Sequence, residues 1–248
     1  MKISIVTVVF NRAHCIGNAI DSIQRQSFKN IEHIVIDGGS TDNTVGILRQ
    51  KLAEDTILIS ERDNGIYDAL NKGFKLATGD VIGILHSDDV FFDDQVIERV
   101  AQTFSTQMVD YVYGDIVMER EDGTVSRVWR PGLMKCGRIK SKQIPHPALF
   151  ISTKRLDGIS PPFDPSYRIS ADLKQQLILA NILEATGVYL PIPMVRMKTG
   201  GTSTVNYKAY LQGWSESRRA WNEVHGSGGA LYVMRKVLSK LPGIWNRS

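Results

Sequence analysis

The stretch Ile3-Ser-Ile-Val-Thr-Val-Val-Phe-Asn-Arg12 decides the fold class. From Ile3 to Phe10 it is almost continuously apolar and rich in β-branched residues, and it then turns polar. A strand that is covered on both faces has this composition, because helices lie on both sides of a parallel sheet. Residues 16–26 follow with apolar side chains at helical spacing. The stretch therefore predicts a buried strand that leads into a helix.

The same alternation continues along the chain. Strands are predicted at 31–36, 56–60 and 81–85, and helices at 44–52, 66–77 and 94–104. Alternating strands and helices predict an α/β fold with a mostly parallel central sheet flanked by helices on both faces. Later residues predict a hairpin (111–119 and 125–129), an extended segment (145–152), a helix (171–181), a strand (188–197) and a helix (208–225).

Composition excludes several classes of protein. The net charge is only +4, from 30 basic and 26 acidic residues that are mostly interspersed, so nucleic acid is not an expected partner. Two cysteines, Cys15 and Cys136, cannot build a disulfide framework or a cysteine-based zinc site. The N-terminal stretch lacks a signal-peptide pattern, and no segment approaches the ~20 apolar residues that span a bilayer. We therefore expect a cytoplasmic protein.

Polar residues follow each of the first four predicted strands, where an open α/β sheet binds its ligands. They are Asn11-Arg12, Asp37 to Ser40, Glu61 to Asp63, and Asp88-Asp89. A nucleotide diphosphate is itself negative, so carboxylates beside it require a divalent cation between them. No GxGxxG motif follows the first strand and no GxxxxGK[ST] motif occurs, so neither a dinucleotide oxidoreductase nor a P-loop NTPase is favoured.

Asp88 and Asp89 are the best candidates for that cation, because Mg²⁺ and Mn²⁺ favour one or two carboxylates together with phosphate and water. The alternative is a solvated acidic turn before the helix that begins near Asp94. Within Asp37-Gly-Gly-Ser-Thr-Asp42, the glycines and Ser40 suit a tight turn and a helix cap. Asp37 remains available to accept a hydrogen bond from a nucleobase.

An ordered set of motifs resembles the family 2 glycosyltransferases with the GT-A fold, and most of all the bacterial exopolysaccharide and colanic-acid-type branch. The set is Thr7-Val-Val-Phe-Asn11, Asp37 to Asp42, Asp63-Asn-Gly-Ile-Tyr-Asp-Ala-Leu-Asn-Lys-Gly73, Gly79-Asp80 and Ser87-Asp-Asp89. The match covers roughly residues 3–90, with weaker similarity to about 205. We expect a GT-A domain at 1–205, with a nucleotide-binding half (1–110) and an acceptor half (111–205), and a helical extension at 206–248.

The resemblance implies roles for individual residues on the donor side. The donor-binding residues would be Thr7, Val9, Asn11, Asp37, Asp63, Lys72 and Asp88, with the first two and Asp37 around the nucleobase. Asp88 and Asp89 would stand for the family's acidic metal motif, which binds Mn²⁺ or Mg²⁺. His86 occupies the position of that motif's usual first acid, and it is a possible further ligand.

The resemblance also implies a catalytic base in the second half of the chain. Asp172, at the start of a predicted helix, fits that place, although a first-turn acid also complements a helix dipole. His146 resembles a family histidine near the diphosphate, and a structural histidine is the alternative. Ser203, within Thr199-Gly-Gly-Thr-Ser203, resembles a loop that closes over the donor, with a simple turn as the alternative.

The expected reaction is an inverting transfer of a sugar from a nucleotide-sugar donor to a glycan or lipid-linked saccharide acceptor, in bacterial polysaccharide biosynthesis. Asp172 would take the proton of the acceptor hydroxyl. Two alternatives stay open: a nucleotidyltransferase that makes a nucleotide sugar, and a GT-A domain that binds nucleotide without turnover. The first would normally carry a basic glycine-rich loop near the N-terminus, where residues 7–17 offer only Arg12 and Gly17.

The C-terminal residues predict a basic amphipathic helix. Leu231, Met234, Leu238 and Leu241 fall at helical spacing, Arg235, Lys236 and Lys240 take other positions, and Trp245 follows. Such a helix can lie in the headgroup region of an anionic membrane, so residues 231–245 are a candidate peripheral contact with the inner face of the plasma membrane. The alternative is that the apolar stripe packs on the protein itself or on a second subunit.

Overall fold

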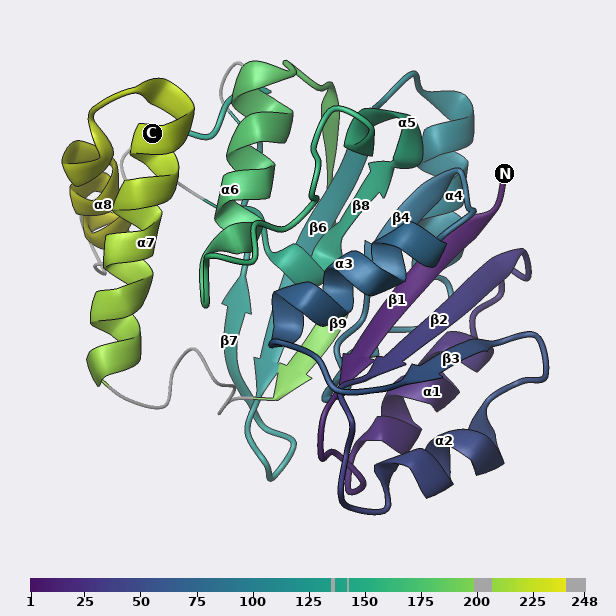
Figure 1. Cartoon of the computed structure of the whole chain (residues 1–248). Coiled ribbons are helices and arrows are strands. Elements are labelled where there is room, and N and C mark those ends of the chain that lie inside the picture. The colour runs from purple at the N-terminus through teal and green to yellow at the C-terminus, as the bar shows by residue number, and fades with distance from the viewer. Residues whose placement is uncertain (135–136, 142, 199–206, 240–248) are drawn as a thin grey trace.

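The computed structural model describes residues 1–134, 137–141, 143–198 and 207–239. Within these residues one sheet of nine strands runs in the order β3-β2-β1-β4-β8-β6-β9-β5, with β7 paired to β6 (Figure 1). Helices lie on both faces of this sheet (Figure 1). The predicted α/β class is confirmed.

The first half of the sheet is parallel, as predicted. It contains β1 (Ile3–Val9), β2 (Ile31–Asp37), β3 (Ile57–Ser60) and β4 (Val81–Ile84). The helices between and after them are α1 (Ile16–Gln24), α2 (Thr44–Lys51), α3 (Ile66–Leu76) and α4 (Val96–Thr106). All seven residues of β1 are buried, which is the outcome that its apolar composition predicts.

The second half of the sheet is mixed. Its strands are β5 (Asp89–Phe91), β6 (Tyr111–Glu119), β7 (Val125–Trp129), β8 (Leu149–Ser152) and β9 (Gly187–Lys198). The hairpin of β6 and β7 is confirmed, and β8 lies antiparallel between β4 and β6. The extended segment expected over 145–152 is a strand only from Leu149, because His146–Ala148 form the 3₁₀ turn η2. The short strand β5 was not predicted.

The second half also carries α5 (Thr153–Leu156), α6 (Ala171–Leu177) with a π-helical turn η3 (Ile178–Ile182), α7 (Tyr207–His225) and α8 (Gly229–Leu238). Two apolar cores lie on opposite faces of the sheet. One core takes side chains from α1, α2 and α4, among them Ile20, Leu48 and Val100. The other takes side chains from α3, α6 and α8, among them Phe74 and Tyr232.

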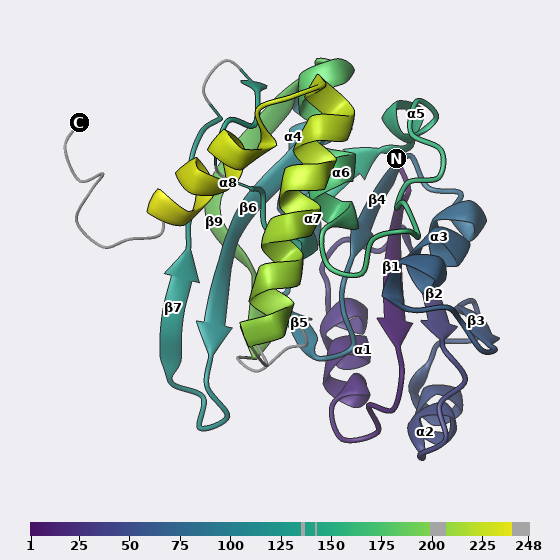
Figure 2. The same cartoon turned by 60° about the vertical axis from the view of Figure 1, so that its left-hand side comes forward.

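The C-terminal helices are docked on the rest of the chain (Figure 2). Helix α7 packs on α6, and α8 packs on α7. Tyr232 of α8 is buried, and its ring stacks on Trp221 of α7 with 4.6 Å between centroids. The opposite side of α8 exposes Leu231, Met234 and Leu238. Part of the predicted amphipathic helix therefore packs on the protein, and an apolar stripe stays uncovered.

Lys240, Leu241 and Trp245 lie outside the described residues. Of the helices that the structure does describe, none is long and apolar enough to cross a membrane.

Candidate functional site

The loops that follow β1 and β2 are held together by side-chain hydrogen bonds. Asn11 adopts a left-handed backbone conformation with φ of 50°, and its Oδ1 accepts a hydrogen bond from the Thr41 backbone N–H at 2.8 Å. The Asn11 backbone N–H donates to Ser40 Oγ, also at 2.8 Å. Further along, the Ala13 N–H donates to Asp42 at 3.1 Å. The motif residues after the two strands thus form one rigid edge of the sheet.

Asp37 lies beneath that edge and is fully buried. Its carboxylate accepts hydrogen bonds from the Gly39 N–H at 3.2 Å, the Ser40 N–H at 3.1 Å and the Ser60 hydroxyl at 2.7 Å. The Ser40 hydroxyl donates to it as well. In this structure Asp37 therefore organises the turn, and its oxygens are already engaged by protein donors. The expected contact of Asp37 with a nucleobase stays a prediction.

Thr7 lies within the core, beside a histidine of β2. It is fully buried in the middle of β1, and its Oγ1 lies 3.0 Å from His33 Nε2 on β2, at hydrogen-bond distance. Burial lowers the pKa of His33 to about 4, so that the pair is neutral at physiological pH. The expected place of Thr7 beside a nucleobase stays a prediction. Val9, two residues on, pairs with Asp37 at the ends of their strands and is nearly buried.

Asp63 lies beside the loop after β2, and its charge acts on Lys72. Asp63 accepts a hydrogen bond from the Gly65 N–H at 2.9 Å, and its carboxylate packs so closely on Gly38 that a Cβ there would overlap it. Lys72 is 2.8 Å from Glu61 and 3.7 Å from Asp68. The hydrogen bond from Lys72 to Glu61 raises the lysine pKa, with further help from nearby Asp68, Glu61 and Asp63.

Asp88 and Asp89 occupy the turn from β4 to β5, and they differ in exposure. Asp88 is partly exposed, whereas Asp89 is buried, and its Oδ2 has no hydrogen-bond partner among the described residues. Burial, and then the charge of Asp88, raise the pKa of Asp89 well above its usual range. Across the described residues, no group of three or more His, Cys, Asp or Glu side chains is arranged to hold a metal ion by itself.

A buried oxygen without a partner, next to a second carboxylate that solvent reaches, fits a cation that takes its other ligands from phosphate and water. The same donor set does not fit a cation held by protein ligands alone. The acidic pair therefore suits a metal that arrives with a nucleotide diphosphate.

Three predicted residues from distant parts of the sequence meet in a second cluster. His86 follows β4, His146 begins η2, and Asp172 stands in the first turn of α6. The rings of His86 and His146 have centroids 6.3 Å apart, and His146 Nδ1 is 3.9 Å from Asp172 Oδ2. Burial lowers the pKa of each histidine to about 4, so both are neutral at physiological pH. The charge of Asp88 acts on His86 in the direction that raises the histidine pKa, so the two clusters interact electrostatically.

The two oxygens of Asp172 have different surroundings. Oδ2 accepts a hydrogen bond from the Gln143 amide at 2.7 Å, while Oδ1 is buried without a partner among the described residues. The side chain as a whole is 19% exposed. Burial raises the pKa of Asp172, and the nearby Lys236 ammonium opposes this shift. One oxygen is therefore held by Gln143, and the other has no hydrogen bond among the described residues.

Helix α7 holds the segment that carries Asp172. Glu216 accepts hydrogen bonds from the backbone N–H groups that precede α6, at 2.8 Å from Ile169 and 2.9 Å from Ser170. A carboxylate at a helix N-terminus satisfies donors that have no partner within the helix. Periodicity places Glu216 on a helix but does not reveal this contact, so sequence reasoning missed it.

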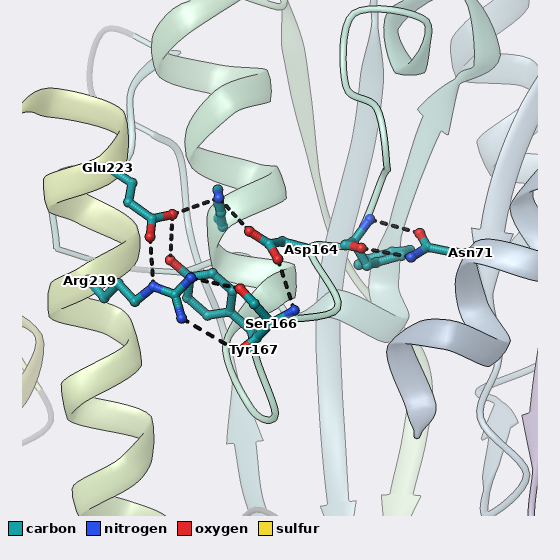
Figure 3. Close-up of polar contacts among 8 residues, drawn as sticks. Asn71, Asp164, Ser166, Tyr167, Arg219 and Glu223 are labelled. Carbon is teal, nitrogen blue, oxygen red and sulfur yellow. Dashed lines mark hydrogen bonds and ion pairs between the residues drawn. The ribbon is translucent and has the colours of Figure 1, made fainter. Parts of the chain in front are cut away.

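A polar network continues along α7 (Figure 3). The Tyr167 hydroxyl donates to Glu223 at 2.9 Å, and Arg219 donates to Glu223 at 2.6 Å. Lys174 follows Asp172 by two residues in α6. Its Nζ lies 2.7 Å from an Asp164 carboxylate oxygen and 2.6 Å from a Glu223 carboxylate oxygen. These contacts join the loop before α6, α6 itself and α7 into one unit.

Ser203 lies outside the described residues, so its expected place in a loop over the donor has no structural counterpart here.

Comparison with known proteins gives the family. The model of the family described as glycosyl transferase family 2 matches residues 4–155. The chain belongs to this family. It is 34% identical, over 174 residues, to a PGL/p-HBAD biosynthesis glycosyltransferase of Mycobacterium tuberculosis, in a match that covers 68% of this chain and 66% of the relative. The chain thus spans just under two thirds of that relative's length.

Other relatives extend the likeness over more of the chain. An uncharacterized glycosyltransferase of Mycobacterium tuberculosis is 31% identical over 206 residues, which cover 82% of this chain and 77% of the relative. A crystal structure of Staphylococcus aureus TarS in complex with UDP-GlcNAc has a TM-score of 0.68 at 18% identity, over 95% of this chain and 70% of that one. The mannosyltransferase PcManGT of Pyrobaculum calidifontis, with GDP-Man and Mn²⁺, has a TM-score of 0.62 at 15% identity, over 96% and 73%. These structures share the GT-A fold with this family 2 member.

Proposed function

We propose that this family 2 chain is a metal-dependent, inverting glycosyltransferase that moves a sugar from a nucleotide-sugar donor to a hydroxyl acceptor. The observation that carries the proposal is the state of Asp172. One of its oxygens is held by Gln143, the other is buried without a partner among the described residues, and burial raises its pKa. A general base works best when its pKa is closer to the operating pH than that of a free carboxylate.

The donor would bind along the edge formed by the loops after β1, β2 and β3. The nucleotide would contact Asn11 and Val9 at this edge, and also Asp63 and Lys72. Thr7, Val9 and Asp37 would lie around the nucleobase, and the hydrogen bonds that Asp37 accepts from Gly39 and Ser60 would hold the turn in place. UDP and GDP sugars are both candidate donors, since relatives of the same fold are described with each.

Asp88 and Asp89 would hold Mn²⁺ or Mg²⁺, with His86 as a possible further ligand. Such a cation, when bound, neutralises negative charge on the diphosphate leaving group. His146 would lie near the same group, where a neutral imidazole N–H can donate a hydrogen bond to an oxygen.

In the proposed step the acceptor oxygen attacks the anomeric carbon of the donor sugar. A bond forms between that oxygen and the carbon, the bond from the carbon to the diphosphate breaks, and the nucleoside diphosphate leaves with the bonding electrons. Asp172 Oδ1 takes the proton of the acceptor hydroxyl. Because a single displacement occurs from the face opposite the leaving group, the anomeric configuration inverts.

A lipid-linked saccharide would be the acceptor in polysaccharide or glycolipid synthesis, and this proposal gives the exposed stripe of α8 a role. Leu231, Met234 and Leu238 would rest on the inner face of the plasma membrane, next to the exposed Arg235, which anionic lipids would attract. Peripheral binding of this kind would bring the site to a membrane-bound substrate.

A donor screen tests the proposed function. Purified protein is incubated with UDP and GDP sugars and Mn²⁺, and release of nucleoside diphosphate is measured. We expect slow hydrolysis of one donor without any acceptor, and faster release with a saccharide acceptor. Release of pyrophosphate from a nucleoside triphosphate and a sugar phosphate would instead identify a nucleotidyltransferase. Binding of nucleotide without any turnover would identify a non-catalytic domain.

A further inference from the structure

Lys236 connects the last described helix to the proposed catalytic base. Its Nζ donates hydrogen bonds to Gln143 Oε1 and to Ser217 Oγ, both at 3.1 Å. Gln143 Nε2 in turn donates to Asp172 Oδ2 at 2.7 Å. The contacts thus run from α8, through the segment before η2, to the first turn of α6.

We propose that Lys236 and Gln143 are positioning residues that hold Asp172 ready for proton transfer, so that α8 is part of the catalytic unit. This proposal rests on the proposed function, because it takes Asp172 to be the base. It concerns residues far from the donor motifs, on an element that the sequence assigned to a separate extension.

The first reason is the orientation of the Gln143 amide. A glutamine side chain has one accepting end and one donating end, which a 180° flip exchanges. A lysine ammonium can only donate, so Lys236 fixes the Gln143 oxygen on its own side. The amide N–H₂ must then face Asp172. In the flipped orientation, the amide oxygen would face the Asp172 carboxylate, and the two would repel each other. Lys236 disfavours this orientation.

The second reason is the division of labour between the two Asp172 oxygens. Gln143 occupies Oδ2, while Oδ1 keeps no partner among the described residues. A base held at one oxygen presents the other at a fixed angle, and orientation of this kind contributes strongly to rate. The hydrogen bond from Gln143 therefore orients Asp172 and leaves Oδ1, the oxygen that must receive the proton, without a bond from Gln143.

The third reason is charge. Lys236 is the cation that acts on Asp172, and it lowers a carboxyl pKa that burial raises. The other titratable groups near Asp172 come from several elements. They are His86 after β4, His146 of η2, Tyr67 of α3, Glu216 of α7 and Tyr232 of α8. Burial lowers the pKa of both histidines to about 4 and raises that of both tyrosines, so these four groups are neutral near pH 7.

The test is the pH profile of kcat/KM for donor hydrolysis, with water as acceptor and nucleoside diphosphate release as the readout. Lys236→Met removes the charge, and Gln143→Leu removes the hydrogen bond to the carboxylate. Each change favours protonated Asp172, so the acid limb of the profile should move to higher pH, by about one unit for Lys236→Met. Each variant should also lower kcat while the donor KM stays unchanged.

Two controls separate this proposal from a general loss of structure. Arg218→Met removes an exposed positive charge from α7, next to Ser217, and should leave the profile in place. Lys236→Arg keeps the charge, so the acid limb of its profile should lie close to that of the unchanged protein. Because Gln143 lies outside the helices, its variant gives an answer even if Lys236→Met fails to fold.

The outcomes are distinct. Unchanged acid limbs in both Lys236→Met and Gln143→Leu would overturn the positioning role while leaving the function intact. Full activity of Asp172→Asn would instead overturn the proposed base. A loss of activity in Lys236→Met with an unmoved acid limb would show that Lys236 only supports the fold.

Discussion

The side-chain amide of Asn71 and the backbone of Phe163 exchange two hydrogen bonds. Asn71 Nδ2 donates to the Phe163 carbonyl at 2.7 Å, and the Phe163 N–H donates to Asn71 Oδ1 at 2.9 Å (Figure 3). The two residues are 92 positions apart, so α3, in the first half of the chain, holds the loop that leads to Asp172. Asn71 therefore fixes the proposed base relative to the donor side of the sheet.

The Asn71→Ala variant should be less stable and less active. Two partly buried backbone groups lose their partners, which costs about 1–3 kcal/mol of unfolding free energy. The loop before α6 then shifts, and a small displacement of a catalytic group lowers kcat by about tenfold or more. Urea unfolding and donor-hydrolysis kinetics measure the two effects. Asn18→Ala, at an exposed position of α1, is the control. Unchanged kcat in a destabilised Asn71→Ala would show that the loop is not tied to catalysis.

The Asp172→Asn variant should bind donor normally and turn it over slowly. It removes the proton acceptor and keeps the shape, and general-base catalysis contributes about 10²–10⁴-fold. Nucleotide affinity by calorimetry and single-turnover rates test both parts, with Asp157→Asn, an exposed acid, as the control. NMR of the product gives the anomeric configuration. Retention of the donor's configuration would exclude single displacement whatever the variant does.

Activity should depend on a divalent cation at the acidic pair. We expect excess EDTA to abolish nucleoside diphosphate release and Mn²⁺ to restore it. Asp88→Asn should raise the Mn²⁺ concentration needed for half-maximal rate, with little change in melting temperature, because Asp88 is partly exposed. Asp55→Asn, an exposed acid elsewhere, controls for charge. Full turnover in excess chelator would contradict the metal site.

The exposed stripe of α8 should bind anionic vesicles. Serine substitution of Leu231, Met234 and Leu238 together should reduce co-sedimentation without unfolding the protein, since all three side chains are exposed. Binding should also weaken as salt rises, because each basic residue near the surface contributes about 1 kcal/mol. Met108→Ser, at a fully exposed residue, is the control. Deleting α8 is a poorer test, because it removes buried Tyr232 from the core. Equal binding by the triple variant would show that the stripe does not contact membrane.

The sequence by itself determined the α/β class, the strand positions in the first half and the polar strand ends. These follow from local burial, since a strand covered on both faces must be apolar along its length, as β1 is. The ordered motifs also predicted family membership. Periodicity predicted the helices at 16–26, 66–77 and 208–225, because each has an apolar face of its own.

Only the tertiary structure decided what each polar side chain does. Thr7 and Val9 lie on one uniformly buried strand. Its composition therefore does not predict that the Thr7 hydroxyl lies at hydrogen-bond distance from His33 in the core. The carboxylate of Asp37 accepts hydrogen bonds from Gly39 and Ser40 of its own motif and from Ser60 at the end of β3, and the motif gives no sign of the contact with Ser60. Gln143 meets Asp172, and Lys236 meets Gln143, across long sequence separations that no local periodicity marks. Such pairings depend on how helices dock, and docking is settled by packing of the whole chain.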